Sequence, residues 1–273
     1  MVEPIPDYKN LDVSGEALQA AGRMEARARE AASQEMFHQL VAPLLTSETR
    51  TIFEFGCGTA ALSRRIARAR PHARVYAGDK SEGMLKVARH LVEDEHISNL
   101  RLEYWDVLET PAFPFPGEKF DLIISSVVVP YLDDSQATML IKNLATRLAP
   151  KGILAFVEQD LNTDSVNFPN YDLLRRILAK DMRNLKRTLA LGLRPLLRQA
   201  GLQVLPRSSF LWTDDAYGEY TQELLERLAR SASDKGQITL NEEDEWKRTL
   251  DELAQTGDFY YGLVYHLVAG RRE

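Results

Sequence analysis

Two glycines and an acidic residue stand together in the first half of this chain, in a spacing that suits a nucleoside. Gly56 and Gly58 follow the apolar run Thr51–Phe55 and precede a stretch rich in alanine and arginine. Because glycine has no Cβ, the backbone can turn sharply there, and the helix predicted to follow offers unpaired N–H groups to a ligand. The turn also fits the dinucleotide fingerprint G-x-G-x-x-G/A, so it predicts a nucleoside-type ligand without saying which.

Glu54 favours one kind of nucleoside. Its carboxylate lies two residues before Gly56 and would repel a pyrophosphate, whereas it suits a ligand that presents an ammonium group or hydroxyls. S-adenosylmethionine is such a ligand. Cys57, between the glycines, could be taken for a nucleophile, but no histidine is near it in the sequence and the turn itself explains a small residue there.

Residues 51–61 resemble the first motif of the class I S-adenosylmethionine-dependent methyltransferases, which reads hydrophobic, hydrophobic, Asp/Glu, hydrophobic, Gly-x-Gly-x-Gly. Ala60 takes the place of the third glycine. Residues 120–126, 148–154 and 197–202 resemble the family's fourth-strand motif, the turn before strand five and the segment before strand six. The tail of the chain resembles the bacterial small-molecule and natural-product members. The resemblance implies an α/β fold with a Rossmann-like seven-stranded sheet in the order 3-2-1-4-5-7-6, the last strand antiparallel, with helices on both faces and a helical cap.

Two further acids follow predicted strands. Asp79 ends the second strand and can accept hydrogen bonds from ribose hydroxyls; the alternative is a helix N-cap, for which Ser81 is better placed. Asp106 follows the third strand, where the resemblance implies a contact with the adenine amino group; the alternative is a solvated turn residue. With S-adenosylmethionine as the implied cofactor, the residues expected to bind it are Glu54, Gly56, Cys57, Gly58, Asp79, Lys80, Met84, Asp106, Val107 and Ser126.

Methyl transfer from a sulfonium is an in-line displacement, so the protein must chiefly hold the acceptor against the methyl and exclude water. A general base would help a hydroxyl acceptor. Glu158 and Asp160 are the first candidates because they are expected to leave strand five near the methyl; the alternative is a structural turn. His38 and His266 are further candidates. A lone histidine on a helix, such as His38, is more often a boundary residue, and packing in the last strand is the favoured role of His266. The aromatic residues expected to line an acceptor pocket, or else to pack in the core or cap, are Tyr8, Tyr131, Tyr171 and Trp212.

Strand and helix patterns alternate from residue 50 onward, which predicts a parallel sheet covered by helices on both faces. Strands are expected at 51–55, 74–78, 100–105, 120–127, 153–157, from 201 toward 212, and at 259–268. Residues 1–48 are predicted to be an N-terminal helical cap segment and 49–273 the methyltransferase domain, in which 214–257 is a helical insertion that contributes to the cap. We expect this cap to be mobile and to close over the ligands.

The composition of the chain limits which partners and which cellular compartment are expected. A net charge of −6 and a pI near 5.5 disfavour a nucleic-acid partner, which usually meets a basic face. The single cysteine permits neither an internal disulfide nor a cysteine metal cluster, and no apolar run approaches membrane-spanning length. A cytoplasmic protein with a small-molecule acceptor, and with no metal, membrane or nucleic-acid partner, is expected; the oligomeric state is left open, with a homodimer as one option.

The sequence thus predicts S-adenosylmethionine-dependent methyl transfer to a small, partly apolar or aromatic molecule by in-line displacement under a closed cap. The alternative is a cofactor-bound cyclase, or another nonmethylating enzyme of natural-product biosynthesis, on the same fold. A nonenzymatic cofactor sensor is a third option, which would need a partner surface that the sequence does not reveal.

Overall fold

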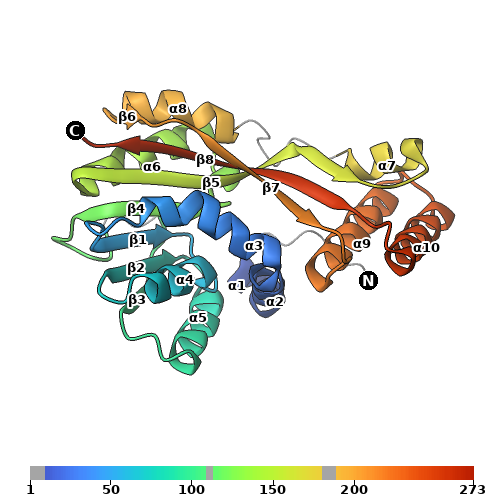
Figure 1. Ribbon diagram of the computed structural model, residues 1–273, viewed down its shortest axis with the longest axis horizontal. Coiled ribbons are helices and arrows are strands. Elements are labelled where there is room, and N and C mark those ends of the chain that lie inside the picture. The colour runs from blue at the N-terminus through green and yellow to red at the C-terminus, as the bar shows by residue number, and fades with distance from the viewer. Residues whose placement is uncertain (1–9, 109–112, 180–188) are drawn as a thin grey trace.

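The computed structural model describes residues 10–108, 113–179 and 189–273 of the 273-residue chain. Within this part, eight strands form one sheet in the order β3-β2-β1-β4-β5-β8-β6, and β7 also pairs with β8 (Figure 1). The strands are β1 Thr51–Phe55, β2 Arg74–Asp79, β3 Leu100–Tyr104, β4 Phe120–Ser126, β5 Leu148–Val166, β6 Gln203–Val204, β7 Ser208–Asp214 and β8 Tyr261–Arg271. β1 to β5 run parallel to one another, whereas β8 runs antiparallel to β5, β6 and β7.

This order confirms the predicted sheet and its antiparallel last strand, with one correction. The expected sixth strand is divided into β6 and β7, so the last strand is the eighth. Both pieces pair with β8, at Val204↔Gly270 and at Ser208↔Leu267. Pro206 lies in the interruption, and because proline has no N–H to donate to the ladder, it explains the break.

β5 is longer than the sequence predicts, and this changes the setting of the two candidate bases. It runs over Leu148–Val166 instead of 153–157, and it pairs with β8 as far as Val166↔Tyr261. Glu158 and Asp160 therefore lie inside a strand and do not leave it on a turn, contrary to the prediction. The physical reason is that β8 continues the ladder opposite both residues, well beyond the parallel part of the sheet.

Helices cover both faces of the sheet because strand side chains alternate between two cores. Ile52 of β1 packs in one core with Ile66 of α4, and Phe53 packs in the other with Leu140 of α6. The helices are α1 Leu11–Ser14, α2 Ala17–Arg29, α3 Ala31–Met36, α4 Ala61–Ala69, α5 Glu82–Asp94, α6 Asp134–Arg147, α7 Tyr171–Leu178, α8 Leu189–Gln199, α9 Glu219–Asp234 and α10 Leu240–Thr256. A π-helical turn, Phe37–Val41, continues α3.

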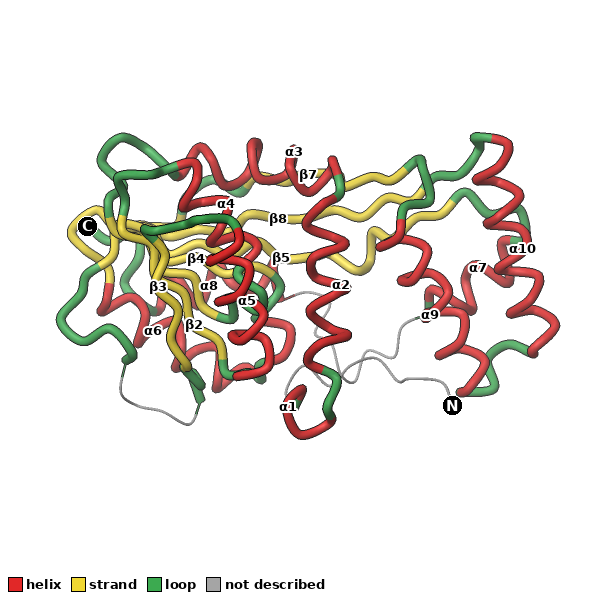
Figure 2. The backbone as a smooth tube through the Cα atoms, turned by 90° about the horizontal axis from the view of Figure 1, so that it is seen from below, coloured by secondary structure: helices red, strands yellow, loops and turns green. Residues whose placement is uncertain are grey.

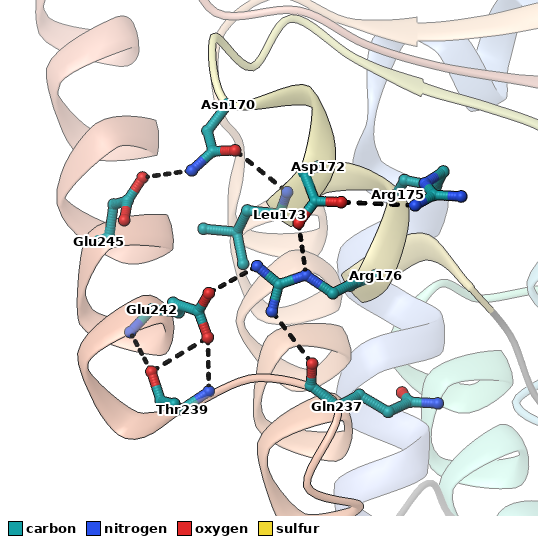
Figure 3. A network of polar contacts seen from close by, with 9 residues as sticks. All are labelled: Asn170, Asp172, Leu173, Arg175, Arg176, Gln237, Thr239, Glu242 and Glu245. Carbon is teal, nitrogen blue, oxygen red and sulfur yellow. Dashed lines mark hydrogen bonds and ion pairs between the residues drawn. The ribbon is translucent and has the colours of Figure 1, made fainter.

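The extended ends of β5, β7 and β8 carry α7, α9 and α10 as a separate helical group (Figure 2). Arg176 of α7 ties this group together (Figure 3). Its Nε donates to Asp172 at 2.9 Å, its Nη1 to the Gln237 carbonyl at 3.1 Å and its Nη2 to Glu242 of α10 at 2.5 Å. Glu242 also forms a capping box with Thr239 that starts α10. Arg176 thus braces α7 against α10 and the segment before it.

The N-terminal helices divide between two places. α1 and α2 lie at the carboxyl edge of the sheet, whereas α3 and the π-helical turn pack on its face, where Phe37 and Leu40 are buried (Figure 2). Two contacts join α2 to α9: Arg23 to Glu223 at 3.4 Å and Arg29 to Glu219 at 3.1 Å. The two parts expected to form a cap therefore touch each other, and their closure over ligands stays a prediction. None of the helices in the described ranges is both long enough and apolar enough to cross a membrane.

Candidate active site

The glycine turn between β1 and α4 is enclosed on two sides. Gly56 (φ +62°) and Gly58 (φ +53°) adopt the left-handed conformation that glycine tolerates best. A Cβ on Gly56 would lie 2.5 Å from Val128 Cγ2, and one on Gly58 would lie 2.6 Å from Met24 Sδ. Side chains at these positions would not fit, so α2, which carries Met24, lies directly against the turn.

Glu54 lies buried on β1, and its carboxyl group faces the start of α4. Oε2 accepts the N–H of Ser63 at 2.9 Å and also accepts the Ser63 hydroxyl. Burial raises the pKa of Glu54 to about 8; the two Ser63 bonds oppose this rise, and the charge of Asp79 adds to it. Glu54 and Asp79 are therefore within electrostatic reach of each other, and a ligand ammonium between them would be stabilised.

Asp79 fixes the glycine turn to the end of β2. Its Oδ2 accepts the Gly58 N–H at 2.7 Å, and its Oδ1 accepts the Ser81 N–H at 2.9 Å. Burial raises the pKa of Asp79, while the hydrogen bonds from Ser81 and Gly58 oppose that rise. The cap of α5 is Ser81, whose Oγ accepts the Met84 N–H at 3.1 Å, as the sequence predicts. Because Ser81 caps α5, the Asp79 carboxylate can hold the glycine turn and bind a ligand beside it.

Asp106 completes the row of acids at this edge. It is buried directly after β3, and its Oδ1 accepts the Leu108 N–H at 2.9 Å, which closes a turn. The Trp105 N–H donates to the Asp79 carbonyl at 2.9 Å and ties the end of β3 to the end of β2. The fold therefore brings acids from three successive strands to one edge of the sheet.

The other residues expected at the cofactor surround these acids. Cys57 is buried with its N–H on the Gly78 carbonyl at 3.1 Å, and burial raises the pKa of its thiol, which opposes a role as a nucleophile. Lys80 and Val107 are partly buried beside the ends of β2 and β3. Met84 of α5 is buried against the alanines of α2, so it joins this helix to the cofactor edge of the sheet.

Glu158 holds the backbone that follows β4. Val127, directly after Ser126, has a φ of +57°, a conformation that β-branched residues rarely adopt. Glu158 Oε1 accepts the N–H groups of Val128 at 3.3 Å and Val129 at 3.4 Å. Oε2 is buried and has no hydrogen-bond partner in the described ranges, and burial raises the pKa of Glu158 to about 8. Glu158 thus holds the strained turn that carries Val128 against the glycine turn.

Asp160, the second predicted base, belongs to a polar chain across three strands. Its Oδ2 lies 3.5 Å from Nε2 of His266 on β8, and Nδ1 of His266 lies 2.7 Å from Oγ of Ser209 on β7. Its Oδ1 accepts the Asn162 N–H at 3.1 Å. His266 is buried in β8, as the favoured prediction of packing requires, and it also makes these polar contacts across the strands.

The predicted tyrosines are dispersed. Tyr8 lies outside the described residues. Tyr131 is partly exposed in the 3₁₀ turn that follows Val128, next to the segment held by Glu158. Tyr171 is 73% exposed at the start of α7, on the distal helical group, so the structure does not place it with the acids of the sheet edge.

Two further candidates lie away from this edge. Trp212 is buried in the core, and its Nε1 donates to Ser33 Oγ at 3.0 Å, which corrects the expectation that it lines an acceptor pocket. Its position in β7 turns the indole toward the face covered by α3. His38 is exposed on the π-helical turn, whose Phe37 packs on that same face. Glu158 alternates with Val157 and so points to the opposite face, and His38 is not brought together with it.

Asp12 of α1 is a site residue that the sequence did not reveal. Its Oδ1 accepts the Ser81 hydroxyl at 2.7 Å and the Gly83 N–H at 3.1 Å, and its Oδ2 accepts the Glu82 N–H at 2.8 Å. It therefore caps α5 from another helix and fixes α1 beside the cofactor edge. Asp12 and Ser81 are 69 residues apart, so no local pattern could signal the pair.

Comparison with known proteins agrees with this geometry. Residues 52–152, which span β1 through the start of β5, match the family model described as a methyltransferase domain. The chain contains a class I S-adenosylmethionine-dependent methyltransferase domain. The resemblance stated from the sequence is thereby confirmed, together with the cofactor of that family.

The relatives differ in how much of the chain they share. A malonyl-[acyl-carrier protein] O-methyltransferase from Priestia megaterium is 32% identical over 124 residues, which are 44% of this chain and 42% of that protein. The chain thus matches less than half the length of this curated relative. Among solved structures, the [4+2]-cyclase SpnF has a TM-score of 0.58 at 14% identity, covering 99% of this chain and 98% of its own. Coclaurine N-methyltransferase has a TM-score of 0.51 at 12% identity, covering 86% and 72%. At these identities the likeness shows the fold alone.

Proposed function

We propose that this protein transfers the methyl group of S-adenosylmethionine to a small, partly apolar or aromatic acceptor held beneath α1 and α2. The observation that carries the proposal is the convergence of Glu54, Asp79 and Asp106 around the glycine turn. Asp79 and Asp106 suit hydroxyl and amino groups and oppose the phosphates of a dinucleotide. Burial raises the pKa of Glu54 to about 8, and a bound ammonium group would favour the charged form of this residue. The proposal therefore follows from the charge of the site as well as from its fold.

Each acid has one part of the cofactor to hold. We assign Glu54 to the ammonium end, Asp79 to the ribose hydroxyls and Asp106 to the adenine amino group. When bound, the cofactor supplies an electrophilic methyl group on a sulfonium. Val128 packs closely on Gly56, and Met24 covers Gly58 from α2, which supports exclusion of water.

In this proposal Glu158 is a positioning residue and not a general base. Its side chain is buried and Oε1 is already engaged by two backbone N–H groups, so it is poorly placed to accept a proton from the acceptor. Its two bonds to Val128 and Val129 instead hold the backbone beside the glycine turn. Asp160 lies two residues along the same face of β5 and remains the candidate base for a hydroxyl acceptor. For other acceptors, proximity alone would carry the reaction.

Two comparisons bear on the acceptor and on the alternative. The similarity to a malonyl-[acyl-carrier protein] O-methyltransferase supports an oxygen acceptor. The fold likeness to the [4+2]-cyclase SpnF over almost the whole chain supports the alternative, a cyclase that binds the cofactor without transferring its methyl group.

Product mass separates these two functions. We would incubate the protein with S-adenosylmethionine and a panel of small phenols, alcohols and carboxylic acids, and follow both cofactor and acceptor by mass spectrometry. Methyl transfer gives, in equal amounts, S-adenosylhomocysteine and a product heavier by one CH₂ group, because the methyl replaces a proton. A cyclase would leave the cofactor intact and the substrate mass unchanged. Binding of NAD in place of S-adenosylmethionine would contradict both.

A further inference from the structure

Arg23 of α2 has an unusual environment for a cation. Its side chain is only 8% exposed, and Nε and Nη2 are both buried without a hydrogen-bond partner in the described part of the chain. Among the described residues, its polar contact is from Nη1 to Glu223 of α9, at 3.4 Å, and that partner is 43% exposed. A buried guanidinium with two unmet donors is costly unless a ligand completes it.

The two unmet donors have a definite geometry. Nε and Nη2 lie on the same edge of the planar guanidinium, and the contact to Glu223 uses the remaining nitrogen. Two parallel N–H groups on one edge match the two oxygens of a carboxylate, which arginine binds in this bidentate manner. The donors left open at Arg23 therefore suit an oxyanion, and S-adenosylmethionine carries one in its carboxylate.

Arg23 also lies beside the proposed reaction site. The next residue, Met24, touches the glycine turn at Gly58. Arg27, one helical turn further along α2, is close enough to Glu158 for its charge to act on that carboxyl group. The sheet edge itself carries Asp79 and Asp106, so a ligand carboxylate would be repelled there without a cation from α2.

We propose that Arg23 binds a ligand carboxylate at the active site through Nε and Nη2. This rests on the proposed function, because the ligand is either the cofactor, through its own carboxylate, or an acceptor that bears one. Either source places the carboxylate under α2 and explains why this helix carries a buried cation over an acidic edge.

Calorimetry with three probes distinguishes the sources. S-adenosylhomocysteine has the carboxylate tail, 5′-methylthioadenosine lacks it, and malonate represents an acceptor carboxylate. If Arg23 binds the cofactor, Arg23→Gln should weaken S-adenosylhomocysteine binding about ten- to a hundred-fold and leave 5′-methylthioadenosine unchanged. If it binds the acceptor, both nucleosides should bind normally, and malonate binding to the nucleoside complex should be lost. Arg23→Lys, which keeps the charge but not the fork, should show a partial loss.

The matched control is Arg29→Gln, which removes one charge from the same helix at an exposed contact with Glu219. Arg23→Met tests folding, because it keeps the apolar stem and its melting temperature should be near that of the wild type. Equal binding of all three probes by Arg23→Gln and Arg29→Gln would overturn the proposal. Failure of the wild type to bind either nucleoside would instead overturn the proposed function, and malonate binding would then still report on Arg23.

Discussion

At the scale of single residues, Asp79 joins the glycine turn to the second strand and faces the proposed ribose. Asp79→Ala should weaken binding of S-adenosylmethionine about ten- to a hundred-fold, because it removes a buried acceptor of hydrogen bonds. Calorimetry measures this directly. Asp79→Asn keeps one carbonyl oxygen and should lose less affinity, and exposed Asp94→Ala should bind like the wild type. Unchanged affinity in Asp79→Ala would contradict the ribose assignment.

Glu158 makes stability depend on pH. Burial raises its pKa from an ordinary value of 4.5 to about 8, so between these values the folded protein holds a proton that the unfolded chain releases. The free energy of unfolding should therefore fall as pH rises through this window. Glu158→Gln cannot release this proton. Between about pH 5 and pH 8 its free energy of unfolding should therefore fall less than that of the wild type, with a difference of a few kcal/mol at most.

Urea denaturation at a series of pH values measures this difference. Burial also raises the pKa of Glu54, but Glu54 is present in both proteins, so the difference between them reports Glu158. Glu93→Gln changes an exposed glutamate and should follow the wild type. Identical pH slopes for the wild type and Glu158→Gln would show that Glu158 does not carry the proton we assign to it.

At the scale of elements, α4 begins from a strained residue. Ala60 stands where the family motif has its third glycine, and its φ of +58° is left-handed, which costs a non-glycine residue about 1–2 kcal/mol. Ala60→Gly should raise the free energy of unfolding by roughly 0.5–1 kcal/mol, since loss of the small methyl group offsets part of the relief. Ala61→Gly, inside the helix, should lower it by a similar amount. A loss of stability in Ala60→Gly equal to that in Ala61→Gly would contradict this account.

At the scale of the whole molecule, α1 and α2 connect the cofactor edge to the distal helices. Asp12 anchors α1 on α5, and Arg23 and Arg29 contact α9. We expect S-adenosylhomocysteine to slow hydrogen exchange in α1, α2 and α9, because ligand binding beneath them stabilises the closed arrangement.

Asp12→Ala should speed exchange in α1 and α2 without ligand and leave β1 unchanged, because it removes three hydrogen bonds to the start of α5. Asp94→Ala, at the other end of α5, is the control. Equal exchange in these helices with and without ligand would show that they are fixed packing elements and not a cover.

The sequence by itself predicted a covered parallel sheet and the cofactor edge, and the resemblance to the methyltransferase family implied the order of the strands. Alternating strand and helix patterns require a covered parallel sheet, and in such a sheet the ends of successive strands meet at one edge. Glu54, Asp79 and Asp106 could therefore be placed together from their positions near the ends of three successive predicted strands. Ser81 could be predicted as a cap because the signal for a helix start lies within a few residues.

Tertiary structure alone decided the state of the site. β5 is extended by its pairing with β8, about a hundred residues later in the chain, and this puts Glu158 and Asp160 inside a strand. Elements distant in sequence also bury three side chains. This burial raises the pKa of Glu158, places Trp212 in the core and leaves Arg23 with two unpaired donors in the described part of the chain. Asp12 reaches α5 in the same way. Local patterns predict which elements form and where they end, whereas the partners and the burial of each side chain depend on non-local contacts that only the folded chain creates.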